Sequence, residues 1–215
     1  RATQLEREKI SHLLLKFAIP AIVGMLVNAL YNIVDKIFVG QAVEPLAIAG
    51  IAVGLPINII MMAFGMLVGV GATSLISIRL GEKQIEEAEL ILGNAMVLAV
   101  TIYFIISILG LIFLEEILRL FGASNTVMPY AKDYMSIILL GGVFQGIAFT
   151  MNNFIRADGN PKIAMGTMLI GAILNIILDY IFILKFDKGI KGAAIATVIS
   201  QIVSAIWVLR YFFSG

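Results

Sequence analysis

Long apolar segments are the feature that most constrains how this chain can fold. Six of them recur along the sequence, and they span residues 17–39, 46–76, 85–114, 127–155, 163–184 and 193–213. An α-helix needs about 20 residues to cross a hydrocarbon core of about 30 Å. Because the segments are apolar on every face and do not alternate in polarity, they favour helices over the strands of a membrane β-barrel. The sequence therefore predicts an all-α integral membrane protein with six transmembrane helices.

Composition supports this membrane assignment. Hydrophobic residues make up 60% of the 215 positions and charged residues only 13%, which is more apolar surface than a soluble domain of this size needs. The connections between the segments are too short for a second folded domain, so residues 1–215 are expected to form one six-helix unit. The net charge of +1 gives no reason to expect nucleic acid as a partner. The expected surrounding is a lipid bilayer.

Basic residues in the short connections predict the orientation in the membrane. With six spans, both termini lie on one side, which then carries nine of the fifteen Lys and Arg residues against six on the other. The nine are Arg1, Arg7, Lys9, Lys16, Arg79, Lys83, Arg156, Lys162 and Arg210, and the six are Lys36, Arg119, Lys132, Lys185, Lys188 and Lys191. The positive-inside rule then favours cytoplasmic termini in a multi-pass protein of the plasma membrane. The lysines at 185, 188 and 191 weigh against this orientation.

Two aspartates, Asp35 and Asp179, lie inside the predicted spans. A charge at the bilayer centre costs roughly 2.5 to 3.5 kcal/mol on insertion scales. Such a residue usually has a partner, a water-filled cavity or a function. Each aspartate lies about four or five residues, some 6 to 8 Å, inside the same predicted outer end of its span. The two carboxylates are therefore expected at one depth.

Two neutral polar residues are expected at the same depth. Asn175 lies one helical turn before Asp179 and therefore on the same helix face, and Thr197 lies four or five residues into the last span. Oxygen atoms of these types suit a hard cation such as Na⁺ or a shared proton. Simpler interpretations stay open, because Asp35 could pair locally with Lys36, and the amide and hydroxyl could merely join neighbouring helices.

Several motifs in order extend this interpretation. They read YNIVDKIFVG at 31–40, LAIAG at 46–50, GVGA at 69–72, SIRLG at 77–81, RADGNPK at 156–162 and LNIILD at 174–179. Together with six apolar segments, this order resembles the amino-terminal six-helix lobe of the multidrug and toxic compound extrusion (MATE) transporters. The resemblance covers essentially the whole chain.

The resemblance implies an antiporter and not an enzyme. Such a protein would export cationic, amphipathic compounds in exchange for Na⁺ or H⁺, with no cofactor besides the coupling ion. The residues that match the family's ion-coupling cluster, and that would hold Na⁺ if it is the coupling ion, are Asp35, Asn175, Asp179 and Thr197. Further expected cavity-lining residues are Tyr31, Asn152 and Asn153. Pro20 and Pro56 are expected to bend their helices, because proline removes a helical hydrogen bond.

The resemblance also raises the question of a partner. Members of the family carry two six-helix lobes, whereas this sequence contains one set of six apolar segments. We therefore expect a second six-helix lobe, either from the same family of chains or from an identical copy.

Two other functions are compatible with a helical membrane protein of this kind. A flippase for lipid-linked precursors, from the same superfamily, would need more cationic residues in its spans to hold a pyrophosphate. An intramembrane aspartyl protease also needs two membrane aspartates, but its usual Tyr-Asp and Gly-x-Gly-Asp contexts are absent, because Asp35 follows Val34 and Asp179 follows Leu178. Both functions remain alternatives to the antiporter.

Overall fold

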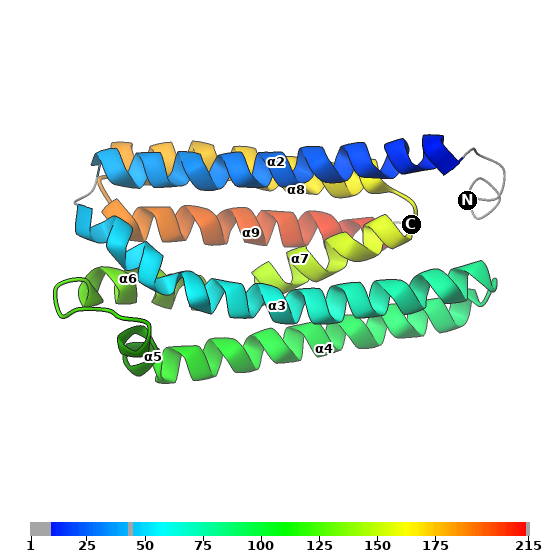
Figure 1. Ribbon diagram of the computed structural model, residues 1–215, viewed down its shortest axis with the longest axis horizontal. Helices are drawn as coiled ribbons and strands as arrows, with labels where there is room; N and C mark the ends of the chain where they lie inside the picture. Colours follow the sequence, from blue (N-terminus) through cyan, green and yellow to red (C-terminus); the bar gives the residue numbers. More distant parts are fainter. Residues whose placement is uncertain (1–9, 43–44, 214–215) are drawn as a thin grey trace.

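The computed structural model describes residues 10–42 and 45–213, without the side chains at positions 10, 12, 13, 28, 32, 35, 36, 41 and 42. Within these residues every regular element is helical, as predicted (Figure 1). The elements are α2 (Ile10–Ala42), α3 (Pro45–Gly81), α4 (Ile85–Ile112), α5 (Leu114–Leu120), α6 (Met128–Leu140), α7 (Gly142–Ala157), α8 (Pro161–Asp179), the π-helical segment η1 (Tyr180–Lys185) and α9 (Gly189–Phe213).

The lengths of these helices agree with a multi-pass membrane protein. Among the described residues, five helical segments are long and apolar enough to cross a membrane, and one of these is α8 together with η1. The pair α6 and α7 makes a sixth span if it is counted as one broken helix. The outward-facing side chains are largely apolar, for example Leu67 at 68% and Leu90 at 66% exposure. In a membrane protein these side chains face lipid, so their exposure carries no penalty.

One predicted span is broken within its length. The segment 127–155 was expected to form a single span, but it divides into α6 and α7, whose axes differ by 56°. The division falls at Gly141 and Gly142. Glycine has a low helix propensity and no Cβ, so this pair allows both the change of direction and close contact with neighbouring helices.

The other boundaries differ less. The last part of the predicted span 163–184 is π-helical, because η1 continues directly from Asp179. Single π turns inside helices are often found at functional sites. Pro20 and Pro56 lie inside α2 and α3, which continue through them. The first part of α3, drawn in cyan, runs obliquely to the rest of that helix in Figure 1. A functional bend at either proline stays a prediction.

The helices form one elongated bundle (Figure 1). Helix α2 packs along α8, α8 packs against α9, and α9 contacts both α6 and α7. Helices α3 and α4 pair on the other side and contact α7. The beginning of α2 and the end of α9 lie at the same end of the bundle, as six crossings require. Which end faces the cytoplasm stays a prediction.

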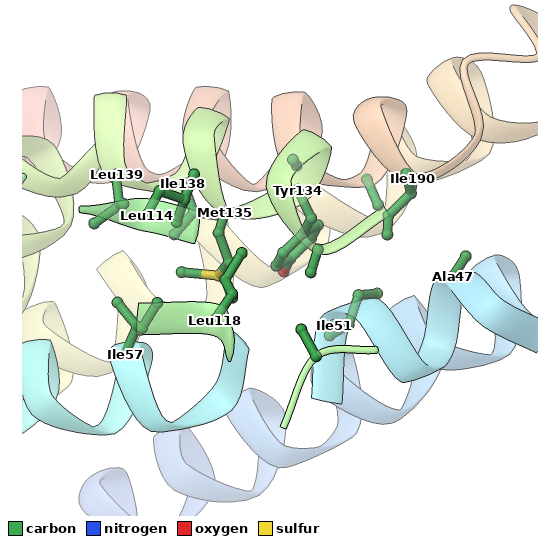
Figure 2. Packing of buried hydrophobic residues seen from close by; sticks show 14 of the residues in the cluster. Ala47, Ile51, Ile57, Leu114, Leu118, Tyr134, Met135, Ile138, Leu139 and Ile190 are labelled. Carbon is green, nitrogen blue, oxygen red and sulfur yellow. The ribbon is translucent and has the colours of Figure 1, made fainter. Parts of the chain in front are cut away.

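Apolar packing holds together the half of the bundle that contains α5 and α6. Figure 2 shows Met135 of α6 directed toward α3, where Ile57 lies, with Leu118 of α5 beside them. Met135 and Leu118 are completely buried. A second buried cluster, which includes Phe154 and Ile155 of α7, fills the other half between α3, α4, α7 and α9. These two clusters fix α9 against both halves of the broken span.

Candidate functional site

Asn175 and Asp179 lie on the buried face of α8. Their exposed fractions are 2% and 0%, whereas Ile173 and Ile177 on the other face are 55% and 50% exposed. A spacing of four residues stacks the two polar side chains one turn apart. A carboxylate and an amide are therefore held next to each other inside the bundle, as the sequence predicted from their spacing.

Thr197 of α9 completes a contact across two helices. The amide nitrogen of Asn175 lies 3.4 Å from Thr197 Oγ1. With the amide turned over, its nitrogen lies 3.2 Å from Asp179 Oδ2, and its oxygen lies 3.3 Å from the backbone nitrogen of Thr197. The second orientation gives the amide nitrogen an acceptor and its oxygen a donor, so the hydrogen-bond network favours it. In either orientation Asn175 bridges to α9.

The fourth predicted residue of this cluster is only partly placed. Asp35 lies on α2, but its side chain is outside the described part of the chain. Helix α2 makes its most extensive contact with α8, the helix that carries Asp179. Tyr31, also on α2, is half-buried. That Asp35 reaches Asp179, and that Tyr31 lines a cavity, stay predictions.

The donor set fits a small hard cation or a proton. Asp179, Asn175 and Thr197 offer carboxylate, amide and hydroxyl oxygens, which are hard ligands. Among the described side chains, no group of three or more His, Cys, Asp or Glu residues is placed to hold a metal ion. The three oxygen donors of Asp179, Asn175 and Thr197 suit Na⁺ better than zinc, which favours nitrogen and sulfur ligands.

Asn152 has a different environment from the three residues above. It is 8% exposed, and its amide nitrogen donates to the carbonyl oxygen of Ala164 at 2.9 Å and also contacts Thr167 Oγ1. Thr167 donates to the same carbonyl at 2.7 Å. These bonds join α7 to α8. The sequence analysis does not include Thr167, although a threonine within a predicted apolar span is a signal for a contact between helices.

Asn153, the neighbouring residue, faces α3. Its amide nitrogen donates to the carbonyl of Phe149 within its own helix at 3.1 Å and lies close to Gly69, where a Cβ would be 2.8 Å away. The side chain is half-buried. Its amide therefore sits between α7 and α3, away from the contact between α8 and α9.

A second polar cluster closes the opposite end of α8. Asn160 donates to Asp158 Oδ2 at 3.0 Å, and Tyr211 of α9 contacts both residues through its hydroxyl. Gly159, between them, has a φ of +79°, which only glycine adopts readily. This cluster ties the turn between α7 and α8 to the end of α9.

Comparison with known proteins identifies relatives of this chain. The MatE family model matches residues 20–181. The multidrug export protein MepA of Staphylococcus aureus (strain MRSA252) is 31% identical over 207 residues, which cover 96% of this chain and 46% of MepA. MepA of Staphylococcus saprophyticus is 30% identical over the same coverage. The chain thus spans about half the length of these relatives.

Solved structures give the same result. The chain superposes on a MATE in its straight conformation with a TM-score of 0.92 at 29% identity, over 99% of this chain and 47% of that one. A MATE in its bent conformation gives a TM-score of 0.91 with the same identity and coverage. A multidrug resistance MATE family transporter in an outward-facing conformation gives 0.92.

Proposed function

Since the chain belongs to the MatE family, whose members are transporters and not enzymes, we propose that it forms one lobe of an antiporter that exports cationic, amphipathic compounds in exchange for Na⁺ or H⁺. The observation that carries this proposal is the buried contact of Asn175 and Asp179 on α8 with Thr197 on α9. It supports the antiporter because it places a carboxylate inside a membrane helix bundle.

The buried carboxylate of Asp179 carries an energetic cost. An ionised group that is removed from water is unfavourable unless a partner or a bound cation compensates it. Asn175 donates a hydrogen bond to Asp179 Oδ2 at 3.2 Å in the orientation in which its own oxygen accepts from the backbone nitrogen of Thr197. A cation or a proton bound at Asp179 offsets the cost of burying its negative charge. Coupling-ion binding is therefore favoured at this place in the lobe.

The same carboxylate accounts for exchange. When Na⁺ or a proton neutralises Asp179, the site no longer attracts a positively charged compound, so the two ligands compete. For transport, the ion must bind one conformation better than the other, because only differential binding shifts a conformational equilibrium. Asp35 on α2 is proposed to contribute a second carboxylate to this competition, and Tyr31 is proposed to line the path of the exported compound.

The partner proposed for this lobe is a second six-helix lobe. The chain spans about half the length of the relatives and structures that it matches. A complete export path is thus proposed to form between this lobe and a second one, which is either a related chain or an identical copy, in the plasma membrane with cytoplasmic termini.

Ion binding to the purified chain tests the proposal. Trp207 is the only tryptophan, and it lies on α9 with Thr197, so its fluorescence can report Na⁺ and pH titrations in detergent. Asp179→Asn and Asp35→Asn are each expected to weaken the ion response by at least about tenfold, as loss of one charged ligand would (about 1.4 kcal/mol per tenfold). Cells that express the complete transporter should lose ion-driven export of a cationic dye with either variant.

Asp133→Asn is the matched control. Asp133 is a half-buried aspartate on α6 that pairs with Lys191 at 3.2 Å and takes no part in the proposed site. It should respond to ions as the wild type does. An unchanged ion response in folded Asp179→Asn protein would overturn the proposal.

A further inference from the structure

The break between α6 and α7 lies inside the bundle and not at its surface. Gly141 and Gly142 are both buried, and the two helices meet there at 56°. Backbone hydrogen bonds still reach Gly141 from both helices: its N–H donates to the carbonyl of Ile137 at 3.1 Å, and its carbonyl accepts from the N–H groups of Phe144 at 3.0 Å and Gln145 at 3.2 Å. In a membrane such a break is tolerated only where protein or water surrounds it.

Helix α4 supplies a polar group at the break. Ser107 is 6% exposed, and its hydroxyl has no hydrogen-bond partner among the described residues. A Cβ placed on Gly142 would lie 2.5 Å from Ser107 Oγ and 2.8 Å from the terminal methyl group of Met61. The hydroxyl thus faces the backbone at the break. It is available to backbone groups whose bonding changes when the angle between α6 and α7 changes.

Helix α9 contacts the break from the other side. A Cβ placed on Gly141 would lie 2.5 Å and 2.7 Å from the two methyl groups of Val198. Val198 directly follows Thr197, the residue that contacts Asn175 of the proposed ion site. Neighbouring residues on a helix point in directions about 100° apart. One turn of α9 therefore touches the ion site on one face and the helix break on another.

We propose that the break at Gly141 and Gly142 is a hinge, and that its angle is coupled to occupancy of the Asn175, Asp179 and Thr197 site through the contact of Gly141 with Val198. This inference rests on the proposed function. An ion that draws Thr197 toward Asn175 moves the same turn of α9, and Val198 then moves against Gly141. Helix α6, the first half of the broken span, then turns relative to α7. By thermodynamic reciprocity, a change in the hinge alters ion affinity to the same extent.

The first test enlarges the hinge contact. Gly141→Ala puts a methyl group against Val198, whose branched side chain has little rotamer freedom, so α9 has to shift. We expect Na⁺ affinity, measured by Trp207 fluorescence, to fall about tenfold, within the range usual for coupled sites. Adding Val198→Ala removes both opposing methyl groups, and the double variant should recover wild-type affinity to within about twofold.

Gly166→Ala is the matched control. Gly166 lies on α8, the helix that carries the ion site, and a Cβ there meets nothing within 4 Å. The control should bind Na⁺ as the wild type does. Two results would overturn the inference: unchanged affinity in Gly141→Ala, or a folded double variant that binds as weakly as the single variant. Failure of the proposed function is different, because the wild type itself would then show no ion response.

A second test measures the angle directly. The chain has no cysteine, so spin labels can be placed at Leu120→Cys on α5, beside α6, and at Lys162→Cys in the first turn of α8, which follows α7. Both positions are exposed. We expect the distance between the labels to change when Na⁺ is added at saturating concentration, and not to change in the same pair with Asp179→Asn. An unchanged distance in labelled protein that binds Na⁺ would refute the hinge.

Discussion

The hydroxyl of Tyr103 on α4 donates a hydrogen bond of 2.8 Å to the backbone carbonyl of Met61 on α3. The ring is 1% exposed, and it packs directly on Gly65 of α3 and Gly146 of α7, where no Cβ would fit. One side chain therefore connects three helices. Tyr103 lies one helical turn from Ser107, the residue that faces the break at Gly141 and Gly142. It is therefore a fixed support next to the part of the bundle that we propose to move.

This support leads to a stability prediction. Tyr103→Phe keeps the ring and removes one hydrogen bond, so we expect a loss of about 0.5 to 1.5 kcal/mol in the free energy of unfolding. Tyr103→Ala also leaves a cavity and should cost about 3 to 5 kcal/mol. Thermal unfolding in detergent measures both. As a control, Tyr180→Phe, at a 56% exposed position, should change the free energy of unfolding little. Equal losses of stability from Tyr103→Phe and Tyr103→Ala would contradict a packing role for the ring.

Asn152 provides a second prediction, which separates packing from transport. Its amide bonds to the Ala164 carbonyl and to Thr167, so Asn152→Ala should destabilise the folded state by about 1 to 3 kcal/mol through the lost buried hydrogen bonds. Ion affinity should stay within about twofold of wild type, because additivity holds for sites that share no partner. Asn153→Ala, which breaks only a bond within its own helix, should cost less. A large change in ion affinity with unchanged stability would instead indicate a cavity residue.

The cluster of Tyr211 with Asp158 and Asn160 gives a third prediction. Because these contacts tie the turn between α7 and α8 to the end of α9, Tyr211→Phe should free that turn. We expect backbone amides at 158–160 to exchange hydrogen about tenfold faster, as loss of about 1.4 kcal/mol of local stability would give. Asn160→Ala should have a similar effect on the same amides. Unchanged exchange in both variants would show that the turn is held by other contacts.

The spacing of polar residues along one helix was sufficient to predict part of the site. Asn175 and Asp179 are one turn apart, and helix geometry alone places them on one face. Thr197 was placed by its distance from a predicted helix end, which is a weaker argument, because such ends are uncertain by several residues. Its contact with Asn175 depends on how α9 packs against α8. That packing is tertiary and has no signature in either segment alone.

The break at Gly141 and Gly142 and the partners of Asn152 could not be predicted in the same way. Apolar residues continue on both sides of the two glycines, so hydropathy is uninterrupted, and glycine is frequent in unbroken membrane helices. The sequence of Asn152 and its neighbours likewise shows an amide in an apolar helix, a pattern shared by cavity residues and by residues that join helices. Only the position of the Ala164 carbonyl distinguishes them.

A fourth prediction concerns pH and the short helix α5. Glu115 pairs with Lys132 of α6 at 2.9 Å and with Arg119 at 3.0 Å, and these partners, Lys132 first, lower the pKa of the Glu115 carboxyl below its ordinary 4.5. Because the pKa is lower in the folded state, the pairing stabilises the folded protein at pH values above the pKa of the unfolded state. This stabilisation is lost as the pH falls through the pKa of the folded state. The tie between α5 and α6 should therefore be constant from pH 7 to pH 5 and weaken below pH 4.5.

A single spin label at Leu120→Cys on α5 measures this change as an increase in mobility. With Glu115→Gln the tie is weakened at every pH, so the label should be more mobile at pH 7 and the step below pH 4.5 should disappear. Glu116→Gln, at the exposed neighbouring position, should keep the step. Because the pair is solvent-exposed, added salt should shrink the step by screening. A mobility step well above pH 4.5, or one that survives Glu115→Gln, would mean that a different group holds α5 in place.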